Sequence, residues 1–398
     1  MTAGPLAAST TAERRVSVPL MRFDRLRLEN WKNFRSVDVP LKPRTFLVGP
    51  NAAGKSNLLD ALRFLHDVAQ PRGGGLQAAI EDRLGLSHVR SLHARQQNNV
   101  VIEVEVSDGA DERWRYRLEL TGDKRRPEVV AEVVHHRDES VLDRPDAQDR
   151  SDPERLRQTH LEQVAANQRF RSLAEFFAGI RYLHLVPQLL RESKRFEVVG
   201  RDPLGSDFIR RLVEADRRTR ESRLRRICTT LQAAVPDLQE LRTVRDSDGT
   251  PHLEGRFRHW RPGAGWQTER QFSDGTLRLM ALLWIVADGS EPLLLEEPEL
   301  SLHPAVVREI PRLLHRISHR KSRQVLLSTH SHELLEDQGI DLGEILMVTR
   351  GNKEGSEVTQ AAKRAEIREL LEQGMSPGRA VMPFATAPTV HQGLLFED

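Results

Sequence analysis

The sequence predicts an α/β protein, and three observations lead to that prediction. A short apolar run at 45–48 precedes a glycine-rich loop, after which apolar residues recur at helical spacing. Two further apolar runs, 292–295 and 324–327, each end in polar residues, as buried strands of a parallel sheet do. Residues 99–134 instead alternate between apolar and polar side chains, which is typical of an antiparallel meander with one solvated face.

Composition limits the classes of protein to consider. The 398 residues are enough for two or three lobes. The 60 basic and 58 acidic residues give a net charge of +2, so any DNA-binding surface would have to be a local patch. The single cysteine, Cys228, excludes a disulfide framework and fits a reducing cytosol, and we interpret it as a packing residue.

No apolar run approaches the roughly 18 residues of a membrane span. Residues 1–20 have no apolar region of the kind found in secretory signals and are interpreted as a flexible leader. We therefore expect a cytoplasmic protein that does not associate with a membrane.

The glycine-rich loop is the strongest single signal. It consists of Gly49, Pro50, Asn51, Ala52, Ala53, Gly54, Lys55 and Ser56, with Asn57 directly after it. Strand, glycine-rich turn and helix form the context in which backbone N–H groups surround phosphate oxygens. Lys55 would contact the β and γ phosphates, and the Ser56 hydroxyl would ligate Mg²⁺. An ordinary tight turn is the alternative.

The remaining elements can be placed in chain order. We expect two strands within 21–39, a charged helical segment at 77–97, a surface excursion at 135–172, and a helix from 153 to 177. A strand at 182–186, a basic helical region at 206–235, strands at 253–257 and 266–272, and a helix at 277–287 follow. The predicted units are 1–20, 21–190 with an insertion at 135–177, 191–290, 291–350 and 351–398. The last is expected to contain one helix, 362–371, and an extended tail.

Two adjacent acids, Glu296 and Glu297, end the apolar run at 292–295. Ligands of such sheets collect at the carboxyl ends of the strands. Neighbouring strand residues face opposite ways, so one acid can serve Mg²⁺ while the other orients a water molecule. A solvated acidic turn is the alternative interpretation.

His330 ends the next run in the same manner and is a candidate to contact a γ-phosphate or a water molecule. His303 and His332 are interpreted as caps or surface contacts. Ser273, Asp274 and Gly275 precede the helix at 277–287. They are either a helix cap or a place where a ligand approaches the backbone closely.

Taken together, these motifs resemble the head of ABC-class ATPases. The order of 49–56, 273–276, 293–297 and His330 is similar to that of the branch containing RecF, structural-maintenance-of-chromosomes and OLD proteins. The amino-acid sequences of 296–304 and 328–331 resemble those of the stand-alone "predicted ATPase" members of this branch, which are AAA_21-like and have no Toprim nuclease domain. The resemblance implies a P-loop NTPase fold of ABC-ATPase type, with a mixed central sheet, an antiparallel β subdomain and a helical signature lobe.

The resemblance also implies roles for individual residues. The loop at 49–56 would be the Walker A motif, Glu296 the magnesium-coordinating Walker B acid, Glu297 the catalytic glutamate and His330 the switch histidine. Residues 273–276 depart at two positions from the usual Ser-Gly-Gly-Gln signature. The Q-loop glutamine would be Gln188, with Gln96 or Gln97 as alternatives.

The resemblance implies ATP and Mg²⁺ as cofactors and a homodimer in the ATP-bound state, with a higher assembly left open. The expected function is an ATPase switch that regulates a separately encoded effector, a nuclease or toxin, or a DNA transaction, in anti-phage defence or DNA repair. DNA contact through the basic runs 210–226 and 315–323 competes with a solvated basic face. The alternative function is the nucleotide-binding subunit of a membrane transporter.

Overall fold

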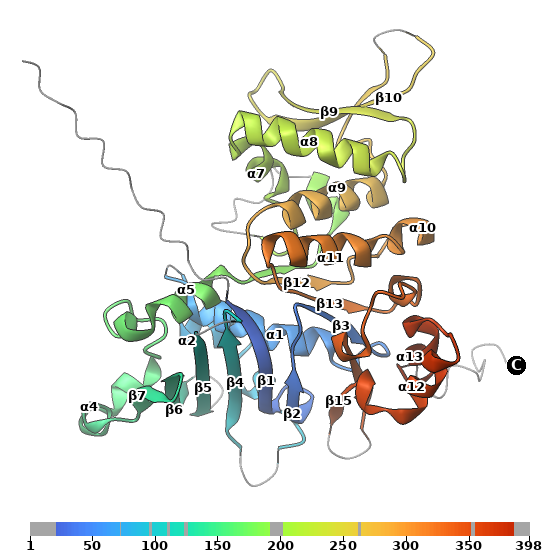
Figure 1. Cartoon of the computed structure of the whole chain (residues 1–398). Coiled ribbons are helices and arrows are strands. Elements are labelled where there is room, and N and C mark those ends of the chain that lie inside the picture. Colours follow the sequence, from blue (N-terminus) through green and yellow to red (C-terminus); the bar gives the residue numbers. More distant parts are fainter. Residues whose placement is uncertain are drawn as a thin grey trace, which may run out of the picture.

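The computed structural model describes residues 21–71, 73–94, 98–109, 112–122, 126–191, 202–261, 264–351 and 355–385. A central, mostly parallel sheet separates an antiparallel sheet on one side from a helical lobe on the other (Figure 1). The expected leader at 1–20, the end of the tail at 386–398, and Gln96 and Gln97 lie outside the described residues.

The central sheet brings the predicted motifs to one edge. In spatial order, its strands are β15 (Ser356–Gln360), β14 (Ile345–Arg350), β3 (Arg44–Val48), β13 (Val325–Thr329), β12 (Leu293–Glu296) and β8 (Arg181–Leu183). All neighbouring pairs are parallel except β14 and β15. Thr329 pairs with Val48 and Ser328 with Glu296, so the loop after β3 and the polar residues after β12 and β13 leave the sheet side by side.

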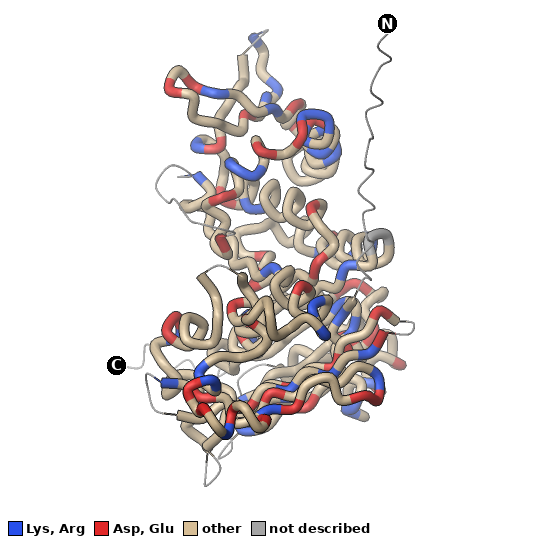
Figure 2. The backbone as a smooth tube through the Cα atoms, turned by 90° about the vertical axis from the view of Figure 1, so that its left-hand side faces the viewer, with Lys and Arg blue, Asp and Glu red and all other residues tan. Residues whose placement is uncertain are grey.

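The predicted meander is present and is larger than expected. The antiparallel sheet has the order β2 (Phe34–Pro40), β1 (Arg22–Trp31), β4 (Val100–Ser107), β5 (Arg113–Gly122), β6 (Pro127–His136) and β7 (Glu139–Arg144). The two expected N-terminal strands thus join this sheet, while β3 starts the central one. Acidic and basic residues intermingle along its strands (Figure 2), with ion pairs such as Arg25–Asp38 and Arg117–Glu103.

Alternation along the buried strands divides the molecule into two cores. Leu47 and Leu326 face the antiparallel sheet together with α1 (Lys55–Ala69) and α5 (Arg171–Gly179). Phe46 and Leu327 face the opposite way, towards α9 (Asp274–Ala287) and α11 (Ile310–Lys321). Because the strands are covered on both faces, only their ends remain available for chemistry.

The helical lobe follows β8. Its elements are α6 (Pro187–Arg191), α7 (Phe208–Glu214), α8 (Arg217–Leu231), β9 (Leu238–Arg245), β10 (Pro251–Phe257), β11 (Trp266–Thr268) and α9. The expected helical region at 206–235 is two helices, because Asp216 begins α8 as an N-cap that accepts from the Thr219 N–H at 3.0 Å. The strands form a small sheet of order β11-β10-β9, and β9 was not predicted.

The expected helix from 153 to 177 is wrong. The segment instead follows α4 (Ala147–Ser151) with two 3₁₀ turns, η1 (Pro153–Arg157) and η2 (Asn167–Phe170), before α5 begins. A buried ion pair between Arg144 and Glu132 organises it: the Glu132 carboxylate accepts from the backbone N–H groups of His160 and Leu161 at 2.7 and 2.9 Å. N–H groups committed to a carboxylate cannot also form a regular helix.

The segment at 77–97 likewise contains two short helices, α2 (Leu76–Glu81) and α3 (Leu86–Val89), in place of one continuous helix. Leu84 and Gly85 have φ values of 63° and 98°, which end helical geometry between them.

The C-terminal part adds helices around the central sheet. They are α10 (Pro304–Val307), α11, η3 (Glu333–Leu335), η4 (Leu342–Glu344), η5 (Ala361–Lys363), α12 (Ala365–Glu372) and α13 (Pro377–Ala385). The expected helix at 362–371 corresponds to α12, whereas α13 replaces the beginning of the expected extended tail. Among the described residues, none of the helices has the length and apolarity needed to cross a bilayer.

Candidate functional site

The loop between β3 and α1 is held in shape by its neighbours in the fold. A Cβ atom at Gly49 would lie 2.0 Å from the Val348 carbonyl oxygen, so only glycine fits against β14. Gly54 has a φ of 113°, and a Cβ there would overlap the Asn33 side chain. Gly49 is thus required by packing within the chain, and Gly54 by both packing and backbone angle.

Asn33 is a supporting residue that sequence reasoning missed. Its amide Nδ2 donates to the Ala53 carbonyl at 2.8 Å and to the Ser356 hydroxyl at 2.7 Å, and its Oδ1 accepts from Asn57 at 2.7 Å. Asn33 therefore ties the loop to α1 and to β15. Because it lies 20 residues before Ala53, in the turn between β1 and β2, no local pattern distinguishes it.

Lys55 occupies the centre of the loop. It is 5% exposed, and its ammonium group donates to the carbonyls of Gly49 and Pro50 at 2.9 and 3.1 Å. Burial lowers the pKa of Lys55 to about 8, against the opposing charges of nearby carboxylates. The group therefore remains mostly protonated at neutral pH.

Glu296 and Ser56 meet across the sheet edge. The Ser56 hydroxyl donates to one oxygen of Glu296, and the Tyr182 hydroxyl of β8 donates to the other. Burial, and then the bond to Glu296, raises the pKa of Tyr182, so it stays a neutral donor. Tyr182 was not predicted as a site residue, because it comes close to β12 only through the pairing of β8 with β12.

The Ser56–Glu296 pair has the donor chemistry of a magnesium site. Mg²⁺ in nucleotide-binding proteins takes a hydroxyl and one carboxylate together with phosphate oxygens and water. Within the described residues no cluster of three or more His, Cys, Asp or Glu side chains could hold a metal on its own. An ion at this edge would thus depend on the nucleotide for its remaining ligands.

Glu297 leaves the strand in a different direction from Glu296. Its φ of 43° breaks the extended geometry, and its N–H donates to the Ser328 carbonyl at 3.1 Å. Its carboxylate lies 2.7 Å from His330 Nε2. The two adjacent acids therefore have different partners.

His330 connects Glu297 with the loop lysine. Its Nδ1 lies 3.3 Å from Lys55 Nζ, on the opposite side of the ring from Glu297. Burial, and next the charge of Lys55, lowers the pKa of His330. A neutral ring satisfies both contacts, because Nδ1 accepts from the ammonium and Nε2–H donates to the carboxylate.

Glu299 holds His330 in place and was not assigned a role from sequence. Its Oε1 accepts from the Thr329 hydroxyl at 2.6 Å and from the His330 N–H at 3.1 Å. The residue is 8% exposed, and burial raises the pKa of its carboxyl group. The turn after β12 is thereby fastened to the end of β13.

The signature residues face a different set of partners. Ser273 caps α9 by accepting from the Thr276 N–H at 3.2 Å, and Asp274 forms a 2.6 Å ion pair with Arg191 of α6. A Cβ at Gly275 would lie 2.4 Å from the Ser301 carbonyl oxygen, so the glycine is needed for contact within the chain. Among the described residues, none of these three hydrogen-bonds to the loop at 49–56 of the same chain.

The remaining candidates have local surroundings. Gln188 is exposed in the first turn of α6. His303 caps α10, accepting from the Ala305 N–H at 3.2 Å, and His332 pairs with Glu333 and Glu336. Cys228 is buried.

The basic runs are partly internal. Asp288, at the end of α9, pairs with Arg181, Arg211 and Arg223. Arg323 is fully buried and donates to backbone carbonyls such as that of Asp288 at 2.7 Å. Several arginines of the two runs therefore stabilise the join between the helical lobe and the sheet rather than an external surface.

Comparison with known families gives an extended match. Residues 44–336, more than half of the chain, match the family AAA_21, described as "AAA domain, putative AbiEii toxin, Type IV TA system". The matched span includes the loop, both strand-end acids and His330.

Curated relatives match shorter segments. The DNA replication and repair protein RecF of Clavibacter michiganensis is 29% identical over 122 residues, which is 30% of either chain. The chromosome partition protein Smc of Cereibacter sphaeroides is 45% identical over 65 residues, which is 15% of this chain and 6% of that protein. The chain therefore spans less than a third of the length of either relative.

A solved structure, the SmcHead bound to the C-winged helix domain of ScpA, superimposes with a TM-score of 0.51. It covers 85% of this chain and 96% of that one at 14% identity, which is a similarity of fold alone.

Proposed function

The chain belongs to the AAA_21 family, and on that premise we propose that it is an ABC-type ATPase of the RecF/SMC branch, which binds and hydrolyses ATP as a dimer-forming switch. One observation supports this proposal most directly. Lys55, His330 and Glu297 form a connected row beside the Ser56–Glu296 pair, at the ends of three adjacent strands. The groups that we propose to bind phosphate, hold the metal and activate water thus lie together.

The loop would bind the triphosphate. N–H groups of the loop and of the first turn of α1 face anions at a helix N-terminus, and Lys55 supplies a positive charge to the β and γ phosphates. The Lys55 ammonium would exchange its contacts with the Gly49 and Pro50 carbonyls for phosphate oxygens. Ser56 and Glu296 would hold Mg²⁺, which neutralises phosphate charge, and Tyr182 would keep the carboxylate in position.

Glu297 would orient the attacking water and accept its proton. The Nε2–H of a neutral His330 fixes one carboxylate oxygen, which leaves the other free to accept from water. His330 would also report the γ-phosphate to the rest of the chain, because its backbone is tied to Glu299.

We further propose that Ser273, Asp274 and Gly275 complete the site of a second copy. In this head-to-tail dimer, each α9 N-terminus would face the phosphates bound by the partner, where its dipole favours negative charge. Asp274 is neutralised by Arg191, which removes a charge that would repel phosphate. Gln188, exposed on α6, would be the Q-loop glutamine.

The effect of this switch would be exerted on another macromolecule. We propose a separately encoded effector, a nuclease or toxin, or a DNA transaction in anti-phage defence or DNA repair, in the cytoplasm. What supports this part of the proposal is the family description, which names a putative AbiEii toxin of a type IV TA system, and the similarity to the DNA replication and repair protein RecF.

Phosphate release from ATP tests the hydrolytic part of the proposal. Wild-type protein should release phosphate only with Mg²⁺, and Glu297→Gln should lower the rate by about 100-fold or more, which is the usual contribution of a general base. Gln188→Ala serves as the milder comparison. Equal rates for wild type and Glu297→Gln would show that Glu297 does not activate water and would overturn the assignment.

A further inference from the structure

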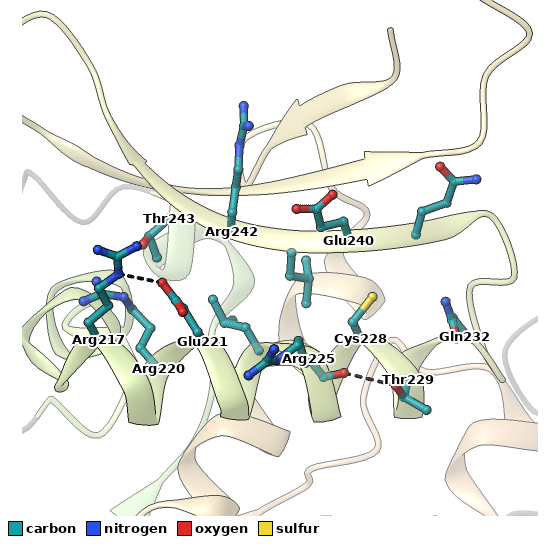
Figure 3. A pocket seen from close by; sticks show the side chains of 13 residues that line it. Arg217, Arg220, Glu221, Arg225, Cys228, Thr229, Gln232, Glu240, Arg242 and Thr243 are labelled. Atoms are coloured by element: carbon teal, nitrogen blue, oxygen red, sulfur yellow. Dashed lines mark hydrogen bonds and ion pairs between the residues drawn. The ribbon is translucent and has the colours of Figure 1, made fainter. Parts of the chain in front are cut away.

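A groove in the helical lobe lies outside the candidate ATP site. It has a volume of about 900 Å³ and runs between α8 and β9 (Figure 3). The α8 side is a continuous stripe of residues spaced three and four apart along the helix. In order they are Arg217, Glu221, Leu224, Cys228 and Gln232. The groove therefore follows nearly the whole 15-residue helix.

The other side of the groove is the edge of a sheet. β9 is the last strand in the order β11-β10-β9, so one of its edges has no strand beside it in the part of the chain that the structure describes. Residues 239–243 all line the groove, although consecutive side chains of a strand point to opposite faces. Five consecutive lining residues indicate that the groove runs along the strand edge, where outward N–H and C=O groups can pair with another strand.

The side chains in the groove favour one kind of occupant. Its floor contains Leu224, Cys228 and Leu241, which are buried. Four arginines and two glutamates line the walls, giving an excess of positive charge. Arg217 pairs with Glu221 at 2.8 Å, whereas the guanidinium of the exposed Arg225 has no hydrogen bond or ion pair among the described residues.

We infer that this groove binds an extended, acidic segment of a partner protein, which adds a strand to the edge of β9. An unpaired strand edge beside a helix is the arrangement by which peptide-binding domains capture extended segments through backbone hydrogen bonds. The five strand residues can accommodate a segment of about 17 Å. Apolar side chains of the segment would cover the floor, and its carboxylates would reach Arg225.

The same features disfavour a nucleic acid. The apolar floor formed by Leu224, Cys228 and Leu241 offers no partner to a phosphate backbone, whereas apolar side chains of a peptide can cover it. A nucleic acid would also leave the outward N–H groups of β9 without the regular acceptors that a peptide supplies.

Fluorescence anisotropy with labelled synthetic peptides tests the inference on the full chain without nucleotide, so its result is independent of ATP hydrolysis. The acidic probe is ELEVELE, with KLKVKLK to test charge and ELEPELE to test the backbone ladder, since proline removes a donor. We expect saturable binding of ELEVELE below about 1 mM and at least tenfold weaker binding of the other two.

Two neighbouring arginines give a matched pair of variants. Arg225 lines the groove, and Arg225→Glu should weaken ELEVELE binding at least about tenfold. Arg226 is exposed on α8 outside the groove, and Arg226→Glu should change the binding less than about twofold. Arg225→Gln serves if the charge reversal impairs folding, as judged by the thermal midpoint.

Three outcomes would overturn the inference. They are no saturable binding of ELEVELE, equal binding of the acidic and proline-containing peptides, and equal weakening by the two arginine variants. Displacement of bound ELEVELE by oligothymidylate would instead identify the groove as a nucleic-acid site and would also contradict it.

Discussion

Glu299 offers a test of how the end of β13 is held. Its Oε1 is the acceptor for both the Thr329 hydroxyl and the His330 N–H, and the carboxylate is buried. Glu299→Ala removes this acceptor and leaves two inward-facing donors without a partner. At about 1–3 kcal/mol for each such group, we expect a loss of about 2–6 kcal/mol in the free energy of unfolding.

Glu299→Gln keeps an acceptor oxygen and removes only the charge. Because burial raises the pKa of Glu299 in the folded chain, the folded state binds the proton more tightly than the unfolded state. Ionised Glu299 therefore opposes folding at neutral pH. This opposition fades as the pH falls through the raised pKa of the folded state, and it is gone below the pKa of the unfolded state. The glutamine variant should stay within about 1 kcal/mol of wild type at pH 7, with its relative stability declining towards acid pH.

Urea-induced unfolding followed by tryptophan fluorescence measures both variants. Phosphate release from ATP should fall in Glu299→Ala, since the His330 backbone loses its anchor, and should be largely retained in Glu299→Gln. If glutamine is as damaging as alanine, the charge matters rather than the acceptor. If alanine is harmless, Glu299 does not position His330.

The remaining predictions concern charge, close packing and a buried ion pair. The value of kcat/KM for ATP should fall as the pH rises through about 8, because Lys55 in the free protein loses its proton there. Lys55→Arg should remove that fall from whatever activity it retains, and a variant with the same pH profile as wild type would refute the assignment. Gly275→Ala should lower the thermal midpoint and reduce the free energy of unfolding by about 1–3 kcal/mol, because the new Cβ would lie 2.4 Å from the Ser301 carbonyl oxygen. An unchanged midpoint would mean that the backbone at Ser301 moves aside at little cost. Arg144→Met leaves the buried carboxylate of Glu132 without an ion pair and leaves Asp149 paired only with Arg155. It should cost about 3–5 kcal/mol in urea unfolding; a smaller loss would show that Glu132 becomes protonated.

The predictable features are those encoded by adjacent residues. The loop at 49–56 and the acids after β12 are contiguous motifs, and parallel pairing then places them together. Strand alternation predicted different partners for Glu296 and Glu297, but in the structure Glu297 lies just beyond β12 and turns away because of its positive φ.

Features created by tertiary contacts could not be predicted. Tyr182 meets Glu296 only because β8 pairs with β12, and Asn33 reaches the loop from another sheet. The helix expected at 153–177 fails because backbone N–H groups bind the Glu132 carboxylate. The sequence Leu238–Arg245 alternates too weakly to indicate a strand, although it pairs along most of β10. Two prolines, Pro377 and Pro383, obscured α13.

The most direct test of the central proposal is the mass and nucleotide content of Glu297→Gln protein incubated with Mg²⁺ and ATP. If a triphosphate held at Lys55 is cleaved by water that Glu297 orients, within a cleft shared by two copies, the variant should form a stable dimer. We expect that dimer to retain intact ATP in a ratio of about one per chain, as trapping of the ground state requires. A variant that remains monomeric, or that converts its bound ATP to ADP as rapidly as wild type, would contradict the proposal.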